Sequence, residues 1–121
     1  ELTEQRFIRL LRTARITGWR RGARLPGRPD LVFYKHRVVV FLDGCFWHGC
    51  PRCYTPPKSN IDYWASKIAG NVARDKRISR ELRTAGWAVV RIWQHSIRTQ
   101  PARSLRRLRL ALDRGSRRLE Q

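Results

Sequence analysis

Residues 30–53 bring together carboxylates, a histidine and cysteines, the side chains that metal-dependent hydrolases use. Asp30 and Asp43 stand at the two ends of a mostly apolar run, and His48 follows five residues later. Carboxylate oxygens bind hard divalent cations, and an imidazole can take a proton from water near neutral pH. Phosphodiester hydrolysis needs both, a cation that neutralises developing charge and a group that activates water. The sequence therefore predicts a metal-dependent hydrolase.

Each carboxylate also has an ordinary structural explanation. Asp30 follows Pro29 and could be a turn residue, and Asp43 precedes Gly44 in a common turn pair. Glu4 could reach the same edge of the molecule from a first helix, or it could be a first-turn carboxylate that the helix dipole favours. Their grouping beside a histidine is what favours a catalytic site.

Three cysteines lie within nine residues, at Cys45, Cys50 and Cys53. Structural zinc takes four sulfur or nitrogen ligands in a tetrahedron, so a histidine should supply the fourth. The spacing favours His95, which follows a predicted strand that would bring it beside the cysteine loop, and leaves His48, inside the loop, as the alternative. Three cysteines cannot all form disulfides within one chain, which indicates a reducing compartment, although ordinary thiols would give the same count.

The charge of the chain points to a polyanionic partner. Its 27 Lys and Arg against nine Asp and Glu give a net charge of +18 in 121 residues, the size of one small domain. Nucleic acid is the expected partner, because each neutralised phosphate releases counterions. A genome that favours Arg codons would explain the arginines but not the shortage of acids. No apolar run approaches the roughly 20 residues of a membrane span, and no signal peptide is visible.

Apolar periodicity predicts the scaffold that must position these residues. In chain order, the predicted elements are a helix from Thr3 to Gly18, strands over 31–34 and 37–42 joined tightly by Lys35 and His36, a helix whose apolar stripe begins at Ile61 and whose C-cap is Gly86, a strand over 87–93, and a helix from Thr99. This order predicts a small α/β sheet with helices on its faces. In a hairpin the ends that carry Asp30 and Asp43 are adjacent, so both carboxylates could face one site.

Aromatic residues stand inside and just after the cysteine loop. Phe46 and Trp47 separate Cys45 from His48, and Trp64 follows near the start of the long helix. Adjacent rings in a loop that faces DNA can wedge between base steps and unstack them. The alternative is a small core beneath the loop.

Four strings in the chain together resemble the very short patch repair (Vsr) endonuclease family, within the restriction-like nucleases. They are Leu25-Pro-Gly-Arg-Pro-Asp30, Asp43-Gly-Cys-Phe-Trp-His48, Trp64-x2-Lys67-Ile68-x2-Asn71-Val-x-Arg74-Asp75, and Gly86-Trp87 through Ile92-Trp93-x-His95. The resemblance covers residues 4–97. It implies a single restriction-endonuclease-like domain of the PD-(D/E)XK type over residues 1–121, with a small central mixed sheet, flanking helices and a zinc-stapled loop.

The resemblance also implies an activity and its partners. The expected enzyme is a cytoplasmic, nucleoid-associated bacterial protein that acts as a monomer on double-stranded DNA. It would recognise the T:G mismatch left by deamination of 5-methylcytosine and nick 5′ to the T with Mg²⁺. A basic N-terminal arm that normally embraces the DNA is expected to be missing, and protein partners in repair stay open.

Residue by residue, the resemblance assigns roles to positions of this sequence. It implies that Asp30 and the backbone carbonyl of Leu42 bind Mg²⁺, and that His48 activates water with Glu4 near it. It implies that a structural zinc is bound by Cys45, Cys50, Cys53 and His95. The implied intercalating rings are Phe46, Trp47 and Trp64, and the groups implied to read the mismatch are Lys67 and Asn71.

The chain departs from the family pattern at a few positions. Some members carry Thr-His where this chain has Leu42-Asp43, so Asp43 could be a metal ligand or could replace that histidine. Others exchange His and Cys at positions 50 and 95, which keeps four ligands. Two other functions stay open, a less selective nuclease and a non-catalytic zinc-stapled nucleic-acid-binding module. The module would have no reason to keep both Asp30 and His48.

Overall fold

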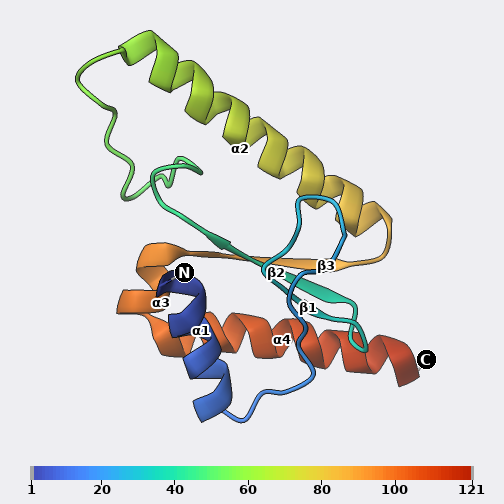
Figure 1. Ribbon diagram of the computed structural model, residues 1–121. Helices are drawn as coiled ribbons and strands as arrows, with labels where there is room; N and C mark the ends of the chain where they lie inside the picture. Colours follow the sequence, from blue (N-terminus) through green and yellow to red (C-terminus); the bar gives the residue numbers. More distant parts are fainter. Residues whose placement is uncertain (1, 121) are drawn as a thin grey trace.

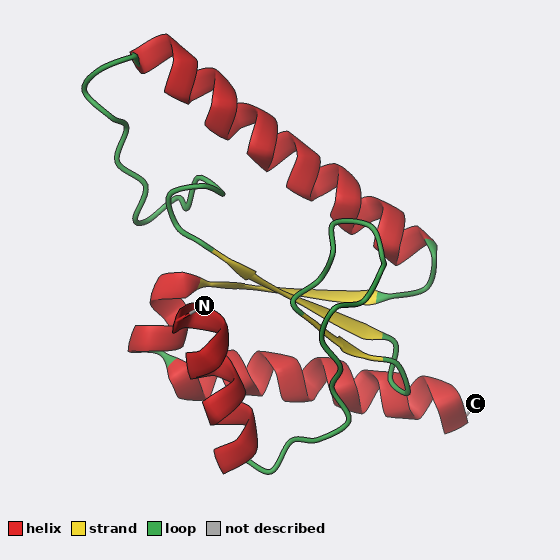
Figure 2. Ribbon diagram, viewed as in Figure 1, coloured by secondary structure: helices red, strands yellow, loops and turns green. Residues whose placement is uncertain are grey.

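A three-stranded sheet with helices on both faces forms the molecule (Figures 1 and 2). The computed structural model describes residues 2–120, with side chains described up to residue 117. Its elements are α1 (Leu2–Thr13), β1 (Leu31–Phe33), β2 (Val38–Asp43), α2 (Ile61–Thr84), β3 (Ala88–Trp93), α3 (Gln94–Thr99) and α4 (Pro101–Glu120). Helix α2 covers one face of the sheet, and α1 and α4 lie on the other (Figure 1). The predicted small mixed α/β fold is confirmed.

The strand order is β1-β2-β3, with β1 antiparallel and β3 parallel to the central strand. A parallel neighbour needs a crossover connection, and α2 supplies it. The register pairs Asp43 with Trp93, so the carboxyl ends of β2 and β3 meet at one edge of the sheet. The loop that follows β2 therefore begins beside α3, which starts directly after β3.

Alternation along β2 divides the apolar side chains between two cores. Val38 and Val40 pack with residues of α1, α3 and α4, while Val39 and Phe41 pack with Leu82 of α2. All four β2 side chains are buried. By the same alternation Asp43 falls on the α2 face of the sheet, where its carboxylate must find polar partners.

Local details differ from the sequence prediction at three places. The hairpin turn spans residues 34–37 and not two residues, because Arg37, with φ 56°, takes the left-handed position that Lys35 and His36 do not. Helix α1 already contains Thr3 in its first turn and ends at Thr13. There Arg15 has φ 58° and Ile16 N–H donates to the Leu11 carbonyl (2.9 Å).

The long helix ends where the sequence predicts. Gly86 has φ 95°, and Trp87 N–H donates to the Leu82 carbonyl (2.9 Å), which closes the C-cap. The predicted apolar stripe is wrong in the first turn, because Ile61 is 60% exposed, whereas Ile68 further along is buried. Helix α3 was not predicted. Within residues 2–120, no helix is both long and apolar enough to cross a membrane.

Candidate active site and metal centre

The cysteine loop folds back on itself and meets α3. Cys45, Cys50, Cys53 and His95 place their ligand atoms within 4.8 Å of one another. His95 Nδ1 lies 3.4 Å from Cys45 Sγ and 3.6 Å from Cys50 Sγ. Gly49, with φ 60°, makes the bend, and Cys50 N–H donates to the Cys45 carbonyl (2.9 Å). The parallel pairing of β2 and β3 is what brings position 95 to the loop.

The four donors fit a structural zinc ion. A tetrahedron with Zn–S bonds of about 2.3 Å separates its sulfurs by about 3.8 Å, within the observed limit. Burial raises the pKa of the Cys45 thiol, and its Cys50 and Cys53 neighbours add to the rise. Burial also acts to raise the pKa of Cys50, but backbone N–H groups of Arg52 and Cys53 and the neighbouring thiols outweigh it and lower the pKa. Of these two thiols, Cys50 is therefore the more ready to bind as a thiolate.

His48, in the same loop, turns to a different set of partners. Its Nδ1 lies 2.5 Å from Asp75 Oδ2, in the middle of α2, and 3.8 Å from Asp43 Oδ1. Among the described residues, no hydrogen bond engages its Nε2. An imidazole whose Nδ1 faces carboxylates is held in one orientation and presents Nε2 outward.

Arg91, from β3, organises the carboxylates around His48. It donates to both oxygens of Asp43 (3.0 and 3.2 Å), to Ser79 Oγ (2.9 Å) and to the Asp75 carbonyl (3.3 Å). Its guanidinium also stacks over the Phe41 ring, 4.1 Å from the centroid. One side chain thus ties β2, α2 and β3 together.

Asp43 is 5% exposed, and burial is the main cause that raises its pKa, against the opposing charges of Arg91 and His48. With both of its oxygens bonded to Arg91, this carboxylate belongs to the network around His48.

The expected carboxylates divide between two cavities. Asp43 and His48 line a cavity of about 410 Å³, together with Asp75 and Arg91. Asp30 lines a second cavity, of about 1000 Å³, formed with Glu4 and residues 21–25, 28 and 29.

Asp30 and Glu4 are each held by a named partner. Asp30 Oδ2 accepts the N–H of Leu42 (2.7 Å), and Glu4 forms an ion pair with Arg21. Asp30 therefore lies against the main chain one residue before Asp43, but the two carboxylates open into different spaces.

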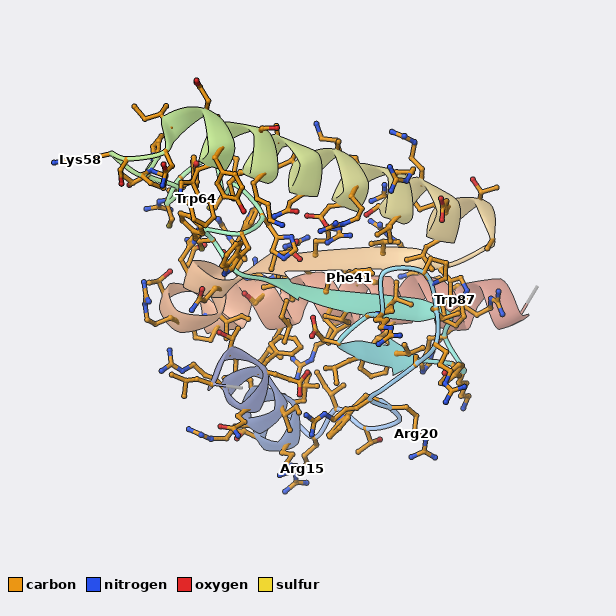
Figure 3. The ribbon with its side chains drawn as sticks, turned by 45° about the horizontal axis from the view of Figure 1, so that its top comes forward. Arg15, Arg20, Phe41, Lys58, Trp64 and Trp87 are labelled. Atoms are coloured by element: carbon orange, nitrogen blue, oxygen red, sulfur yellow. The ribbon has the colours of Figure 1, made fainter. Side chains whose placement is uncertain are left out.

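The aromatic residues cluster at the N-terminal end of α2. Phe46 contacts Trp47 (5.2 Å between centroids) and Trp64 (5.5 Å), and Trp47 lies 5.8 Å from Trp64. Trp47 is 52% exposed, and none of these rings belongs to either core. Figure 3 shows Trp64 beneath the first turns of α2, at the opposite end of the helix from Trp87. The cluster offers exposed ring faces beside the loop that carries His48.

The two residues expected to read the mismatch differ in their surroundings. Lys67 is exposed, whereas Asn71 is buried and donates to the Trp47 carbonyl (3.0 Å). Arg74 in turn donates to Asn71 Oδ1 (3.0 Å). Asn71 therefore fixes the position of the aromatic loop on α2.

The sequence did not predict that Asp75 and Arg91 belong to the site. Asp75 stands in a string quoted above, four residues after Asn71, but a carboxylate in a long polar helix attracts no notice by itself. Arg91 lies in the middle of an apolar strand, and a charged residue at such a position could have indicated a functional role.

A family model and several known proteins match parts of the chain. Residues 3–55 match the family model described as DNA mismatch endonuclease Vsr. The DNA mismatch endonuclease Vsr of Escherichia coli is 38% identical over 97 residues, which cover 78% of this chain and 62% of that protein. The Type II nicking enzyme V.XorIIP of Xanthomonas oryzae is 51% identical over 72 residues (58% and 52%). The Type II nicking enzyme V.NaeI of Lentzea aerocolonigenes is 47% identical over 68 residues (56% and 41%).

In these three comparisons the matched segments span between 41% and 62% of the relatives' lengths. The family model covers the strand pair, the cysteine loop and His48, and the E. coli match extends over most of the chain. The chain is therefore similar to the Vsr family of DNA mismatch endonucleases.

Proposed function

We propose that this chain is a Mg²⁺-dependent endonuclease domain that nicks double-stranded DNA 5′ to the T of a T:G mismatch. The observation that carries the proposal is the position of His48, held through Nδ1 by Asp75 in a cavity that Asp43 and Arg91 also line. The names of the relatives, a mismatch endonuclease and nicking enzymes, support it. We extend it to one restriction-endonuclease-like domain over residues 1–121 that works as a monomer in the bacterial cytoplasm.

Asp30 and the Leu42 carbonyl are the proposed Mg²⁺ ligands. Both offer oxygen atoms, which is the donor chemistry that Mg²⁺ requires, and the Asp30 carboxylate already lies against the main chain of Leu42. When bound, the ion would neutralise charge that develops on the phosphate. We assign Asp43 to a different task, because its buried carboxylate is engaged by Arg91 on both oxygens.

His48 is the proposed general base. With Nδ1 bonded to Asp75, the imidazole carries its proton on that nitrogen, so the lone pair of Nε2 accepts a proton from the attacking water. Asp75 orients the ring and stabilises the positive charge that it acquires. Arg91 holds the Asp43 carboxylate by two hydrogen bonds and the main chain of Asp75 by one, lies 4.0 Å from the Asp75 carboxylate, and would not itself touch the reacting atoms.

The remaining residues would hold the fold and the substrate. Zinc on the Cys45 cluster would fix the loop that carries His48, as structural zinc does in small domains. The exposed ring of Trp47, with Phe46 and Trp64 behind it, would enter the base stack, where a mismatch lowers the cost of unstacking. Lys67 would contact the mismatch, and Asn71 would act there or through the loop that it holds.

Nicking assays on matched T:G and T:A duplexes, with and without Mg²⁺, test the proposal. We expect Mg²⁺-dependent cleavage of one strand of the T:G duplex. Asp30→Asn should abolish most of this cleavage while duplex binding persists or tightens, because a negative charge that faces phosphate is gone. Equal cleavage of both duplexes would indicate a less selective nuclease. Binding without any cleavage by the wild type would indicate a zinc-stapled binding module.

A further inference from the structure

The cavity that holds His48 has a second wall that the proposed chemistry does not use. Lys76, Arg80 and Arg83, all from the second half of α2, line it together with His48 and Asp75. Spacings of four and three residues place these cations on one face of the helix. At a rise of about 1.5 Å per residue, they extend over about 10 Å from the level of the catalytic histidine.

Among the side chains that the structure describes, these cations have no partner. All three are exposed, and within residues 2–117 none forms an ion pair or a hydrogen bond through its side chain. The anionic groups of the same cavity are already engaged, since Asp43 is bonded to Arg91 and Asp75 to His48. The row therefore presents an uncompensated positive charge beside the proposed base.

We propose that Lys76, Arg80 and Arg83 bind successive phosphates of one DNA strand beside the His48 cavity. This inference rests on the proposed function and names where the substrate's backbone lies. Phosphates of one strand advance by about 3.4 Å per nucleotide along the duplex axis, so the row spans about three steps. Flexible exposed cations without buried polar partners position a backbone and do not specify a sequence.

An ordinary explanation exists for one of the three residues. Arg83 lies in the last turn of α2, where a cation stabilises the helix dipole. That effect falls off within a turn and does not account for Lys76 or Arg80. A solvated helix face would account for exposure, but it would give the three cations no larger part in DNA binding than cations elsewhere.

A matched pair of triple variants separates these explanations. The test variant is Lys76→Gln/Arg80→Gln/Arg83→Gln. The control, Arg9→Gln/Arg103→Gln/Arg106→Gln, removes the same charge from exposed positions of α1 and α4, on the opposite face of the sheet (Figure 1). Glutamine keeps helix propensity, and circular dichroism should show both variants folded. Fluorescence anisotropy without Mg²⁺ then measures the affinity for a T:A and a T:G duplex at several salt concentrations.

We expect the test variant to lose about 2.7 from the slope of log affinity against log salt, equally for both duplexes. The control should lose less than 1. Replacing single phosphates by methylphosphonate should weaken wild-type binding at about three consecutive positions. The same replacements should leave the affinity of the test variant unchanged.

Equal slope changes in test and control would overturn the inference in favour of a diffuse charge effect, and so would an unchanged test variant. Neither outcome bears on the proposed function. That fails separately, if the wild type binds duplex but does not nick the T:G substrate.

Discussion

One loop, residues 44–53, serves two neighbouring groups of side chains that differ in construction. The cysteine cluster draws three of its four donors from the loop and only His95 from elsewhere. The group around His48 draws one residue from the loop and the rest from β2, α2 and β3, in Asp43, Asp75 and Arg91. The first group is nearly local in sequence, whereas the second exists only when the sheet and its crossover helix have formed.

This difference separates stability from chemistry. Thiols gathered in a short loop stabilise the fold only when a metal ion joins them, so the cluster should matter for folding. Carboxylates that engage an imidazole should matter for its orientation and protonation. The two groups nevertheless share one loop. Variants of each group therefore test whether the cysteine cluster affects stability without the chemistry, and whether the group around His48 affects the chemistry without stability.

The largest expected effect is the loss of a zinc ligand. Cys53 is exposed, so Cys53→Ser removes little packing, and any large loss must come from the metal. Structural zinc contributes on the order of 10 kcal/mol in small domains, comparable to a whole domain's stability. We therefore expect Cys53→Ser, or chelation of the wild type, to give unfolded protein by circular dichroism. A folded, metal-free Cys53→Ser variant with wild-type thermal stability would show that the cluster is not a structural metal site.

Next in size is the effect of His48→Ala on turnover. The loss of a general base typically lowers the rate by about 10²–10⁴-fold, so nicking of a T:G duplex should fall by this factor. Elemental analysis should still find zinc in the folded variant. Loss of zinc in His48→Ala, with zinc retained in His95→Ala, would exchange the two histidines between the two groups.

A smaller effect is expected at Arg91, which acts through Asp43 and Asp75. Arg91→Met keeps apolar contact with Phe41 but removes the hydrogen bonds to the Asp43 carboxylate and to the Asp75 carbonyl. Outer-shell partners of metal-binding histidines contribute about 10–100-fold, and we expect an effect of that size here. The loss should appear in kcat and in a changed pH–rate profile, with KM nearly constant, and Arg91→Lys should recover part of it.

The exposed Arg77→Met is the control for Arg91 and should leave kcat and the pH–rate profile unchanged. A thermal stability loss in Arg91→Met with unchanged kcat and pH profile would make Arg91 a purely structural residue.

The smallest expected effect concerns Trp47, which tests whether the loop does a third task, mismatch selection. Stacking on an aromatic side chain contributes about 1–3 kcal/mol per base, so Trp47→Ala should weaken T:G binding on the order of tenfold. The loss should be much smaller for T:A, because a matched step resists unstacking more strongly. Anisotropy titrations of both duplexes measure it. Equal losses on both, with the fold intact, would place the rings in a general binding surface.

The sequence predicted the elements better than their meeting points. Three strands and the helix that ends at Gly86 follow from periodicity and from a glycine at a left-handed position. The cysteines were recognisable because their ligand spacing is local. His95 could be linked to them only through the prediction that a third strand ends beside the loop. The parallel register of β2 and β3 agrees with that prediction.

The network around His48 could not be predicted in the same way. Whether Asp75 faces the sheet depends on the rotation of α2 about its axis, and the partner of Asp43 depends on which strand lies beside β2. Neither quantity is recorded in local spacing. The hairpin brought Asp30 beside the main chain of Leu42, but the two carboxylates open into different cavities, and adjacency at strand ends does not determine that.

The crossover topology has a consequence for the order of folding events. Pairing β2 with β3 in parallel closes a long chain segment, and such closure is entropically costly and slow. The cysteine cluster lies at the end of that pairing, and His95 is the donor from the far side. Zinc binding would therefore stabilise the strand pairing that forms most slowly, so refolding should accelerate with zinc. During synthesis, zinc can bind all four ligands only after residue 95 has left the ribosome.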